Sequence, residues 1–236
     1  MATSMVTGGT SGIGREFVTQ LAARGDDIVI VARDTERMAT IKADVEARYG
    51  VSVETIEADL SQREDVDRIA ARLENPAHHV DLLVNNAGFA VHAKILDPDA
   101  LELQDRAFEV MIRAVLVLSA AAGRAMKSRG HGAILNVSSS SAWINTGNYS
   151  AVKAWVLTFT EGLANELAGT GVKVMALCPG WVHTEFHSRA NVTANHLPDF
   201  FWIDAETLVR EALNDLDHGK VVSIPTPLWK FFIAVA

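Results

Sequence analysis

Residues 7–14 read TGGTSGIG, and they stand between an apolar run at 4–7 and a segment with helical spacing at 13–24. Gly8 permits a tight turn, and Gly12 removes a side chain where the backbone would have to approach a pyrophosphate. Gly14 completes the opening of a helix whose N-terminus offers unpaired N–H groups and a positive dipole end. Glycine clusters also occur at ordinary turns, but this one follows a strand and precedes a helix. The stretch therefore predicts a dinucleotide-binding turn at the start of an α/β fold.

Outward from this turn, short apolar runs alternate with longer helical patterns. We expect strands at 4–7, 27–32, 51–57, 80–85, 133–138, 172–177 and 220–224, and helices at 13–24, 35–49, 62–74, 99–128 and 150–168. Parallel neighbours need a crossover, usually a helix, so the alternation predicts a doubly wound parallel sheet of about seven strands, a Rossmann fold. We expect residues 1–236 to form one domain, with an irregular substrate lid around 183–204 over the carboxyl ends of the strands.

Composition narrows the functional classes. The 236 residues are 49% hydrophobic and carry 21 basic against 29 acidic side chains, a net charge of −8. Such a charge gathers neither nucleic acid nor anionic lipid, so we expect no nucleic-acid or membrane partner. The single cysteine, the lack of a signal peptide and the lack of an apolar run of roughly 18 residues predict a soluble cytoplasmic protein. We interpret the apolar ending LWKFFIAVA as a packed terminal helix or a subunit contact rather than a membrane anchor.

The second expected strand ends in the sequence IVIVARD, which bears on the choice of cofactor. An acid at the strand tip would bind the adenosine ribose hydroxyls and select NAD, whereas an arginine would pair with a 2′-phosphate and select NADP. Ala32 holds the tip and Arg33 follows it, so we predict NADP(H) as the preferred cofactor, with NAD(H) possible. The alternative is an exposed arginine that pairs with Asp34 or Glu36. Ser11, in the glycine-rich turn, supplies no second positive charge.

Residues 138–153 read SSSSAWINTGNYSAVK and carry side chains suited to proton transfer. Tyr149 and Lys153 lie four residues apart, so they project from one face of the expected helix. A nearby ammonium favours phenolate and lowers a phenol pKa that starts at about 10 toward the range of a useful acid or base. Alternation along the strand leaves Ser139 or Ser141 on the side of the tyrosine, and Ser141 would leave less chain for the following loop. We therefore favour Ser139; the alternative is a hydrated strand exit.

Together these motifs resemble the classical short-chain dehydrogenase/reductase family over nearly the whole chain. The resemblance rests on TGGTSGIG at 7–14, Asp59-Leu60, NNAG at 85–88, NVSS at 136–139, YSAVK at 149–153 and CPGWVHT at 178–184. It implies that Ser139 orients a substrate carbonyl, that Tyr149 is the acid/base, and that Lys153 tunes Tyr149 and binds the nicotinamide ribose. The expected cofactor-binding residues are Gly8, Thr10, Ser11, Gly12, Ile13, Gly14, Arg33, Asp59, Leu60, Asn85, Asn86, Ala87, Gly88, Tyr149, Lys153, Pro179, Gly180, Val182 and Thr184.

One position departs from the family pattern. Many relatives carry an asparagine in the long helix at 99–128 that holds a water joining the lysine to solvent, and here that position is Met111. A thioether offers no amide to hold the water, so the proton would need another relay or catalysis would be slower. Met111 is explained equally well as a core residue.

Aromatic side chains fall in segments that such a fold places near the strand ends. We expect Trp143, Trp181 and Phe186 to line a pocket for an apolar substrate, although core or subunit contacts explain them as well. The two histidines of HTEFH at 183–187 have a metal-like spacing, but no third ligand is evident, so we expect no metal.

The leading hypothesis is a cytoplasmic, NADP-preferring oxidoreductase that reduces a ketone or aldehyde to an alcohol, or the reverse, on an apolar small molecule. As in such relatives, the apolar helices at 99–128 and 150–168 predict a homodimer or homotetramer. The alternative is a non-catalytic NAD(P)-binding sensor, which would need no phenol at Tyr149. A methyltransferase could share the glycine-rich turn, but it has no use for Tyr149 and Lys153 at this spacing.

Overall fold

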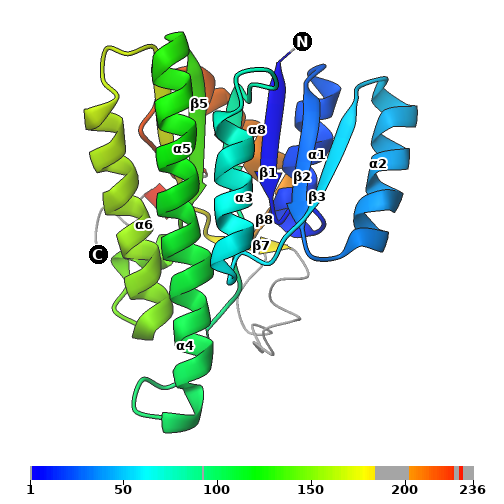
Figure 1. The fold of residues 1–236 in the computed structure, drawn as a ribbon. Helices are drawn as coiled ribbons and strands as arrows, with labels where there is room; N and C mark the ends of the chain where they lie inside the picture. Colours follow the sequence, from blue (N-terminus) through cyan, green and yellow to red (C-terminus); the bar gives the residue numbers. More distant parts are fainter. Residues whose placement is uncertain (1, 92, 184–201, 226–228, 231–236) are drawn as a thin grey trace.

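One parallel sheet forms the centre of the molecule. The computed structural model describes residues 2–91, 93–183, 202–225 and 229–230. Seven strands pair in the order β3-β2-β1-β4-β5-β6-β9 (Figure 1). Their bounds are β1 Thr3–Thr7, β2 Asp27–Ala32, β3 Val53–Glu57, β4 Leu82–Asn85, β5 Gly132–Val137, β6 Val172–Leu177 and β9 Val222–Ser223. Every pairing in this sheet is parallel, so the expected doubly wound Rossmann fold is confirmed.

Helices cover both faces of the sheet (Figure 1). Their bounds are α1 Gly12–Ala23, α2 Thr35–Tyr49, α3 Arg63–Glu74, α4 Leu101–Phe108, α5 Ala114–Arg129, α6 Gly147–Glu166 and α8 Ala205–Asp217. One hydrophobic core joins the sheet to α1, α2 and α8, and a second joins it to α3, α5 and α6. Central strands such as β2, DIVIVA, are buried on both sides, which is why they read as continuous apolar runs.

The strand order reverses between β1 and β4, and the crevice for a ligand in such sheets lies at this point. Thr7 pairs with Val31 at the end of β1, and Asn85 of β4 lies level with Asn136 of β5. The carboxyl ends of β1, β4 and β5 therefore meet at one edge, and the motifs that follow these strands come together there.

The long helix expected at 99–128 is not continuous. A π-helical turn at Glu109–Arg113 separates α4 from α5, and Met111 lies in its middle. A π turn inserts one residue into the helical repeat and often accompanies a functional site. The local sequence has apolar helical spacing throughout, so the pattern gave no sign of the interruption.

The region expected to form a lid is described only at its two ends. Trp181–His183 forms β7 and Trp202–Asp204 forms β8, and the two pair in parallel as a separate small sheet. Residues 184–201, which include Thr184 and Phe186, lie outside the described residues. Helix α8 follows directly, and the Asp204 carboxylate accepts a hydrogen bond from the Thr207 N–H as its N-cap.

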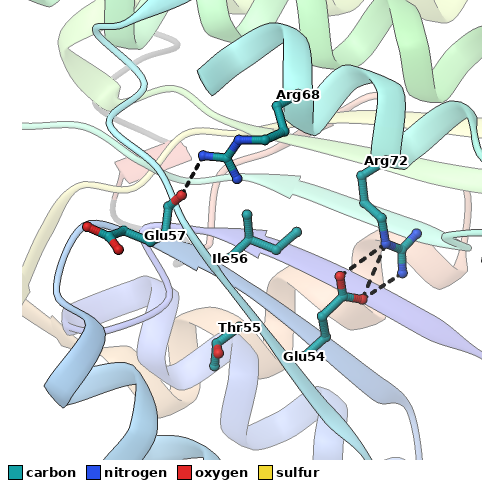
Figure 2. Close-up of a pocket in the computed structure, with 6 residues that line it drawn as sticks. All are labelled: Glu54, Thr55, Ile56, Glu57, Arg68 and Arg72. Carbon is teal, nitrogen blue, oxygen red and sulfur yellow. Dashed lines mark hydrogen bonds and ion pairs between the residues drawn. The ribbon is translucent and has the colours of Figure 1, made fainter. Parts of the chain in front are cut away.

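Edge strand β3 borders a cavity of about 530 Å³ that lies between this strand and α3. Figure 2 shows its lining, in which Arg68 donates to the Glu57 carbonyl oxygen at 2.7 Å and Arg72 pairs with the Glu54 carboxylate at 2.8 Å. None of the expected site residues lines this cavity. We interpret its charged side chains as protection of an exposed strand edge.

No helix in the described part of the chain combines the length and the apolar character that crossing a bilayer requires.

Candidate active site

The glycine-rich turn has the geometry that its sequence predicted. Gly8 and Gly12 have φ values of 66° and 52°, in the left-handed region that glycine adopts without strain. The Gly8 N–H donates to the Val31 carbonyl at 2.8 Å, which ties the turn to β2. Gly14 packs so closely that a Cβ there would fall on the Gly8 carbonyl oxygen and the Asn86 amide. The turn thus brings its backbone to the crevice without side chains in the way.

Helix α1 begins at this turn in a manner that suits an anion. Ser11 is its N-cap, yet no side-chain cap bond forms at this end of the described helix, and its first turn contains no acidic residue. The first N–H groups of a helix have no intrahelical partner and lie at the positive end of the dipole. These groups fit a pyrophosphate, so the residues present fit the dinucleotide that the motif predicts.

The tip of β4 is hydrogen-bonded to the same turn. The hydroxyl oxygen of Thr7 accepts from the backbone N–H groups of Asn86 and Ala87, each at 3.0 Å, and Asn86 Nδ2 donates to the Thr7 carbonyl at 3.0 Å. Thr7 is buried, and sequence reasoning did not single it out. Its place at the start of the TGG run was the available signal.

Asn85 points away from the crevice into a buried polar network. Its amide donates to Asn136 Oδ1 at 2.9 Å and to the Ser119 hydroxyl at 3.0 Å, and Asn136 donates in turn to Thr160 at 3.0 Å. These bonds join β4, β5, α5 and α6 beneath the strand ends. The cofactor-binding role of Asn85 stays a prediction, and the contacts of its side chain are structural.

Arg33 directly follows β2 and pairs with the residue two positions after β3. Its guanidinium is 3.9 Å from the Asp59 carboxylate, and Arg106 approaches the same carboxylate at 3.6 Å. Asp34, the partner considered from the sequence, instead caps α2 by accepting from the Arg37 N–H at 2.9 Å. Burial raises the pKa of Asp59, but hydrogen bonds from Ser61 and the two guanidinium groups outweigh burial, so the pKa falls below its usual value.

A cavity of about 370 Å³ adjoins this pair. Its lining includes Arg33, Asp59 and Arg68. Leu60, the neighbour of Asp59, is buried. The cavity therefore lies at the ends of β2 and β3, beside the expected adenosine position.

Ser139, Tyr149 and Lys153 meet at the end of β5. The Ser139 hydroxyl is hydrogen-bonded to the Tyr149 phenol, although ten residues separate them in the chain. Lys153 Nζ lies 5.7 Å from the centroid of the Tyr149 ring and donates to the Val137 carbonyl oxygen at 2.9 Å. The structure therefore places the three side chains in one cluster, and their catalytic roles stay predictions.

The other serines of the run have different surroundings. Ser138 is buried, and its hydroxyl donates to the Lys153 carbonyl oxygen at 2.7 Å. Ser140 is also buried, and its N–H donates to the Pro179 carbonyl oxygen at 2.8 Å. The Ser141 N–H donates to the Ser139 hydroxyl oxygen at 3.1 Å. Ser139 is thus held by its own turn, and its hydroxyl also reaches the tyrosine.

Burial dominates the electrostatics of the cluster. Burial raises the pKa of Tyr149 to about 12, although the Ser139 hydroxyl lowers it in part. This result corrects the expectation that Lys153 would bring the phenol toward neutrality, because the loss of solvation outweighs an ammonium beside the ring. Burial also lowers the pKa of Lys153 to about 8, while the negative charge on a Cys178 thiolate would raise it. At neutral pH the phenol is therefore protonated.

Met111 of the π turn and Lys153 both lie beside Gly88. A Cβ placed on Gly88 would lie 3.1 Å from the Met111 sulfur and 3.8 Å from Lys153 Nζ, so all three groups converge on one point. Met111 is 1% exposed. The residue is thus a core residue, and it lies on the same side of Gly88 as the Lys153 ammonium.

The remaining predicted residues divide between the strand ends and the undescribed segment. Val182 is buried in β7, and the Trp181 ring lies 5.5 Å from that of Trp202 across the small sheet. Trp143 packs against a cluster formed by Leu157, Ala176 and Cys178, which favours the core interpretation for part of its ring. Thr184 and Phe186 lie outside the described residues.

The histidine segment shows no metal site where it is described. The His183 ring stacks on Trp202 with centroids 4.6 Å apart. Within the described residues, no group of three or more His, Cys, Asp or Glu could hold a metal ion.

Comparisons with known proteins place this geometry in one family. The short chain dehydrogenase family matches residues 2–195. A short chain dehydrogenase of Pseudocercospora fijiensis is 37% identical over 188 residues, which are 78% of this chain and 60% of the relative. A very-long-chain 3-oxoacyl-CoA reductase of Anas platyrhynchos is 32% identical over 219 residues, 90% of this chain and 68% of the relative.

A solved structure agrees over the full length. The short-chain dehydrogenase from Sphingobium yanoikuyae in complex with NADPH superposes with a TM-score of 0.90 at 31% identity, covering 100% of this chain and 93% of that chain. The chain belongs to the short-chain dehydrogenase/reductase family of NAD(P)-dependent oxidoreductases.

Proposed function

We propose that this protein is an NADP-preferring oxidoreductase that interconverts a carbonyl and an alcohol on an apolar small molecule. The observation that carries the proposal is the contact between the Ser139 hydroxyl and the Tyr149 phenol, with Lys153 on the same helix face. The cluster stands at the edge of the sheet where the glycine-rich turn also lies. A proton donor and a site for a hydride carrier therefore share one crevice.

Tyr149 and Ser139 can bind one carbonyl oxygen together. When bound, the nicotinamide supplies a hydride to the carbonyl carbon. Tyr149, protonated at neutral pH because burial raises its pKa to about 12, gives its proton to the oxygen. Ser139 directs a second donor at the same oxygen and so orients the carbonyl. Lys153 places a positive charge beside the phenolate that remains. This protonation state favours reduction at neutral pH, and oxidation needs the phenolate and hence a higher pH.

The charge at the end of β2 supports the preference for NADP(H). Ala32 leaves no acid at the strand tip to bind a ribose diol, and the Arg33 guanidinium is 64% exposed at the mouth of the neighbouring cavity. An exposed guanidinium is free to turn from Asp59 toward a 2′-phosphate, because a pair at 3.9 Å near solvent is weak. The NADPH complex of the similar Sphingobium yanoikuyae enzyme is consistent with this choice. NAD(H) remains the alternative cofactor.

The aromatic side chains of the small sheet support an apolar substrate. Trp181 and Trp202 lie together at the carboxyl edge, beyond the Pro179-Gly180 turn. Aromatic rings near a bound ligand favour apolar ligands. The similar Anas platyrhynchos protein is named as a reductase of very-long-chain 3-oxoacyl-CoA, so a 3-oxoacyl thioester belongs among the first substrates to test.

We also propose that the protein is a cytoplasmic homo-oligomer. Leu103 and Phe108 on α4 and Leu116 on α5 are each more than a third exposed. On α6, Trp155 and Phe159 stack with ring centroids 4.8 Å apart. A second copy could cover these helices, and the apolar area is of the kind found at subunit contacts. The one cysteine, Cys178, is a buried free thiol, which fits a reducing compartment.

The test is a panel of carbonyl compounds with purified protein. Oxidation of NADPH is followed with 3-oxoacyl thioesters, bulky aromatic ketones and aliphatic aldehydes, with NADH and the Tyr149→Phe variant in parallel. We expect turnover with NADPH on at least one apolar carbonyl and its loss in the variant. Turnover that survives in Tyr149→Phe would reject the assigned acid. Tight binding of NADPH without turnover on any compound would favour the sensor.

A further inference from the structure

The indole of Trp229 lies directly on the backbone of Gly180. A Cβ built on Gly180 would collide with the ring, closest to its Nε1, Cε2 and Cδ1 atoms. Gly180 does not have a positive φ in the left-handed region, so an alanine there would meet no backbone strain. The three atoms nearest to that Cβ all belong to the tryptophan ring. This contact joins the C-terminal part of the chain to the turn after β6.

The turn after β6 in turn holds the catalytic serine. The backbone N–H of Ser139 is hydrogen-bonded to the Cys178 sulfur, and the Ser140 N–H donates to the Pro179 carbonyl oxygen at 2.8 Å. On the far side, the Cys178 N–H donates to the Ser223 carbonyl oxygen of β9 at 2.8 Å. The segment 178–180 is therefore a bridge between β9 and the residue that contacts the Tyr149 phenol.

We propose that Trp229 is a positioning residue that presses on Gly180 and so holds Ser139 in register with Tyr149. The proposal rests on the proposed function, because its purpose is to orient the carbonyl bound by these two hydroxyls. Each link is a direct contact between neighbours: the ring on Gly180, the Cys178 sulfur and the Pro179 carbonyl oxygen on the N–H groups of Ser139 and Ser140, and Ser139 on the phenol. An error of about 1 Å in such an arrangement is enough to cost about 100-fold in rate.

A purely structural tail would behave differently from a positioning residue. Loss of tail packing would lower the melting temperature while kcat and KM of the folded enzyme stayed the same. A positioning role predicts that Trp229→Ala lowers kcat about 10-fold, with a smaller change in the Kd for NADPH, while Trp229→Phe retains most of kcat because a flat ring still covers Gly180. The pH dependence of kcat should keep its shape, since the phenol itself is unchanged.

The decisive experiment is a double-mutant cycle. The four forms are the wild type, Gly180→Ala, Trp229→Ala and the double variant, and each is measured for kcat, KM, Kd of NADPH and melting temperature. Alanine at 180 has no room beside the ring, so we expect Gly180→Ala to lower kcat at least 10-fold. In the double variant the ring is gone, so we expect kcat no lower than in Trp229→Ala alone, a strong departure from additivity. Additive losses, or an unchanged kcat in Trp229→Ala, would overturn the proposal.

Gly162→Ala is the matched control. Gly162 has nothing within 4 Å of a built Cβ and lies in α6, so its alanine variant should match the wild type in kcat, KM and the Kd of NADPH, while its melting temperature should rise slightly because alanine favours a helix more than glycine does. If no carbonyl compound is turned over, the proposed function fails by itself. The four forms are then compared by the hydrogen-exchange rates of the backbone N–H groups of residues 138–141 instead of by kcat. Faster exchange in Trp229→Ala and in Gly180→Ala, with no further increase in the double variant, supports the contact path. Exchange unchanged by Trp229→Ala contradicts it.

Discussion

The two ends of the crevice, which we name the phosphate end and the carbonyl end after the groups that we propose bind there, are built differently. At the phosphate end, the glycine-rich turn and the tip of β4 are joined by backbone groups and by Thr7 and Asn86, all within segments that the sequence marks clearly. At the carbonyl end, the cluster around Tyr149 draws on the π turn, β5, α6, the turn after β6 and Trp229. The first end is a local motif, and the second is a tertiary assembly. Mutations should therefore act on binding at one end and on turnover at the other.

Tyr149→Phe is expected to have the largest effect of the variants, and this effect should be on turnover and not on cofactor binding. The variant keeps the ring and its packing but removes the proton donor, so kcat should fall by about 10²–10⁴-fold. The Kd for NADPH should change less than threefold, because the phosphate end is untouched. Stopped-flow rates and a fluorescence titration with NADPH measure the two quantities. A parallel loss of cofactor affinity would show that the two ends are not separable.

Gly14→Ala is expected to act at the other end of the crevice, on cofactor binding. Its Cβ would collide with the Gly8 carbonyl and the Asn86 amide, and overpacking of this kind costs about 1–3 kcal/mol. The glycine-rich turn must move, so we expect the Kd for NADPH to rise at least 10-fold and the melting temperature to fall. Gly25→Ala is not a suitable control, because that glycine has a φ of 91°. Gly162→Ala serves again, and a Kd equal to the wild type in Gly14→Ala would contradict the packing argument.

The sequence predicted the phosphate end more completely than the carbonyl end. The expected bounds of 27–32, 35–49 and 172–177 agree with β2, α2 and β6 because each rests on a local signal, such as the Asp34 N-cap and the left-handed Gly50 that ends α2. Helix α8 was not predicted, although Asp204 and the amphipathic run after it were a usable signal. The π turn at Met111 and the contact of Trp229 with Gly180 depend on tertiary packing, and local sequence patterns do not predict such packing.

Arg33→Ala sharpens the comparison within the phosphate end. A guanidinium that pairs with a 2′-phosphate stabilises the bound cofactor through a charge-assisted hydrogen bond. Exposure to solvent weakens this stabilisation. We expect kcat/KM with NADPH to fall about 10-fold. The value with NADH should stay within a factor of two, since NADH has no 2′-phosphate. Equal losses with both cofactors would mean that Arg33 supports the fold through Asp59 rather than selecting the cofactor.

The smallest expected effect concerns Lys153 at the carbonyl end. Its pKa in the folded protein is about 8, below the usual 10.5, so between these two values the unfolded chain binds more protons than the folded one. The free energy of unfolding should therefore rise as pH increases through this window, by up to about 1.4 kcal/mol per pH unit from this group, and the rise should be absent in Lys153→Met. Denaturant unfolding at several pH values between 7 and 10 measures the slope.

Met111→Asn then tests which residues keep the pKa of Lys153 in the folded protein below its usual value. The Met111 thioether, which lies beside Gly88 as the Lys153 ammonium does, offers weak solvation, whereas an amide oxygen within reach of the ammonium would stabilise it and raise its pKa toward 10.5. The stabilisation between pH 8 and 10 should shrink by less than about 1 kcal/mol, and the amide costs some core packing at every pH. Met111→Leu is the control that removes the sulfur but adds no polar group, and its slope should equal that of the wild type. An asparagine variant with the wild-type slope would show that the lysine is desolvated by the sheet rather than by the π turn.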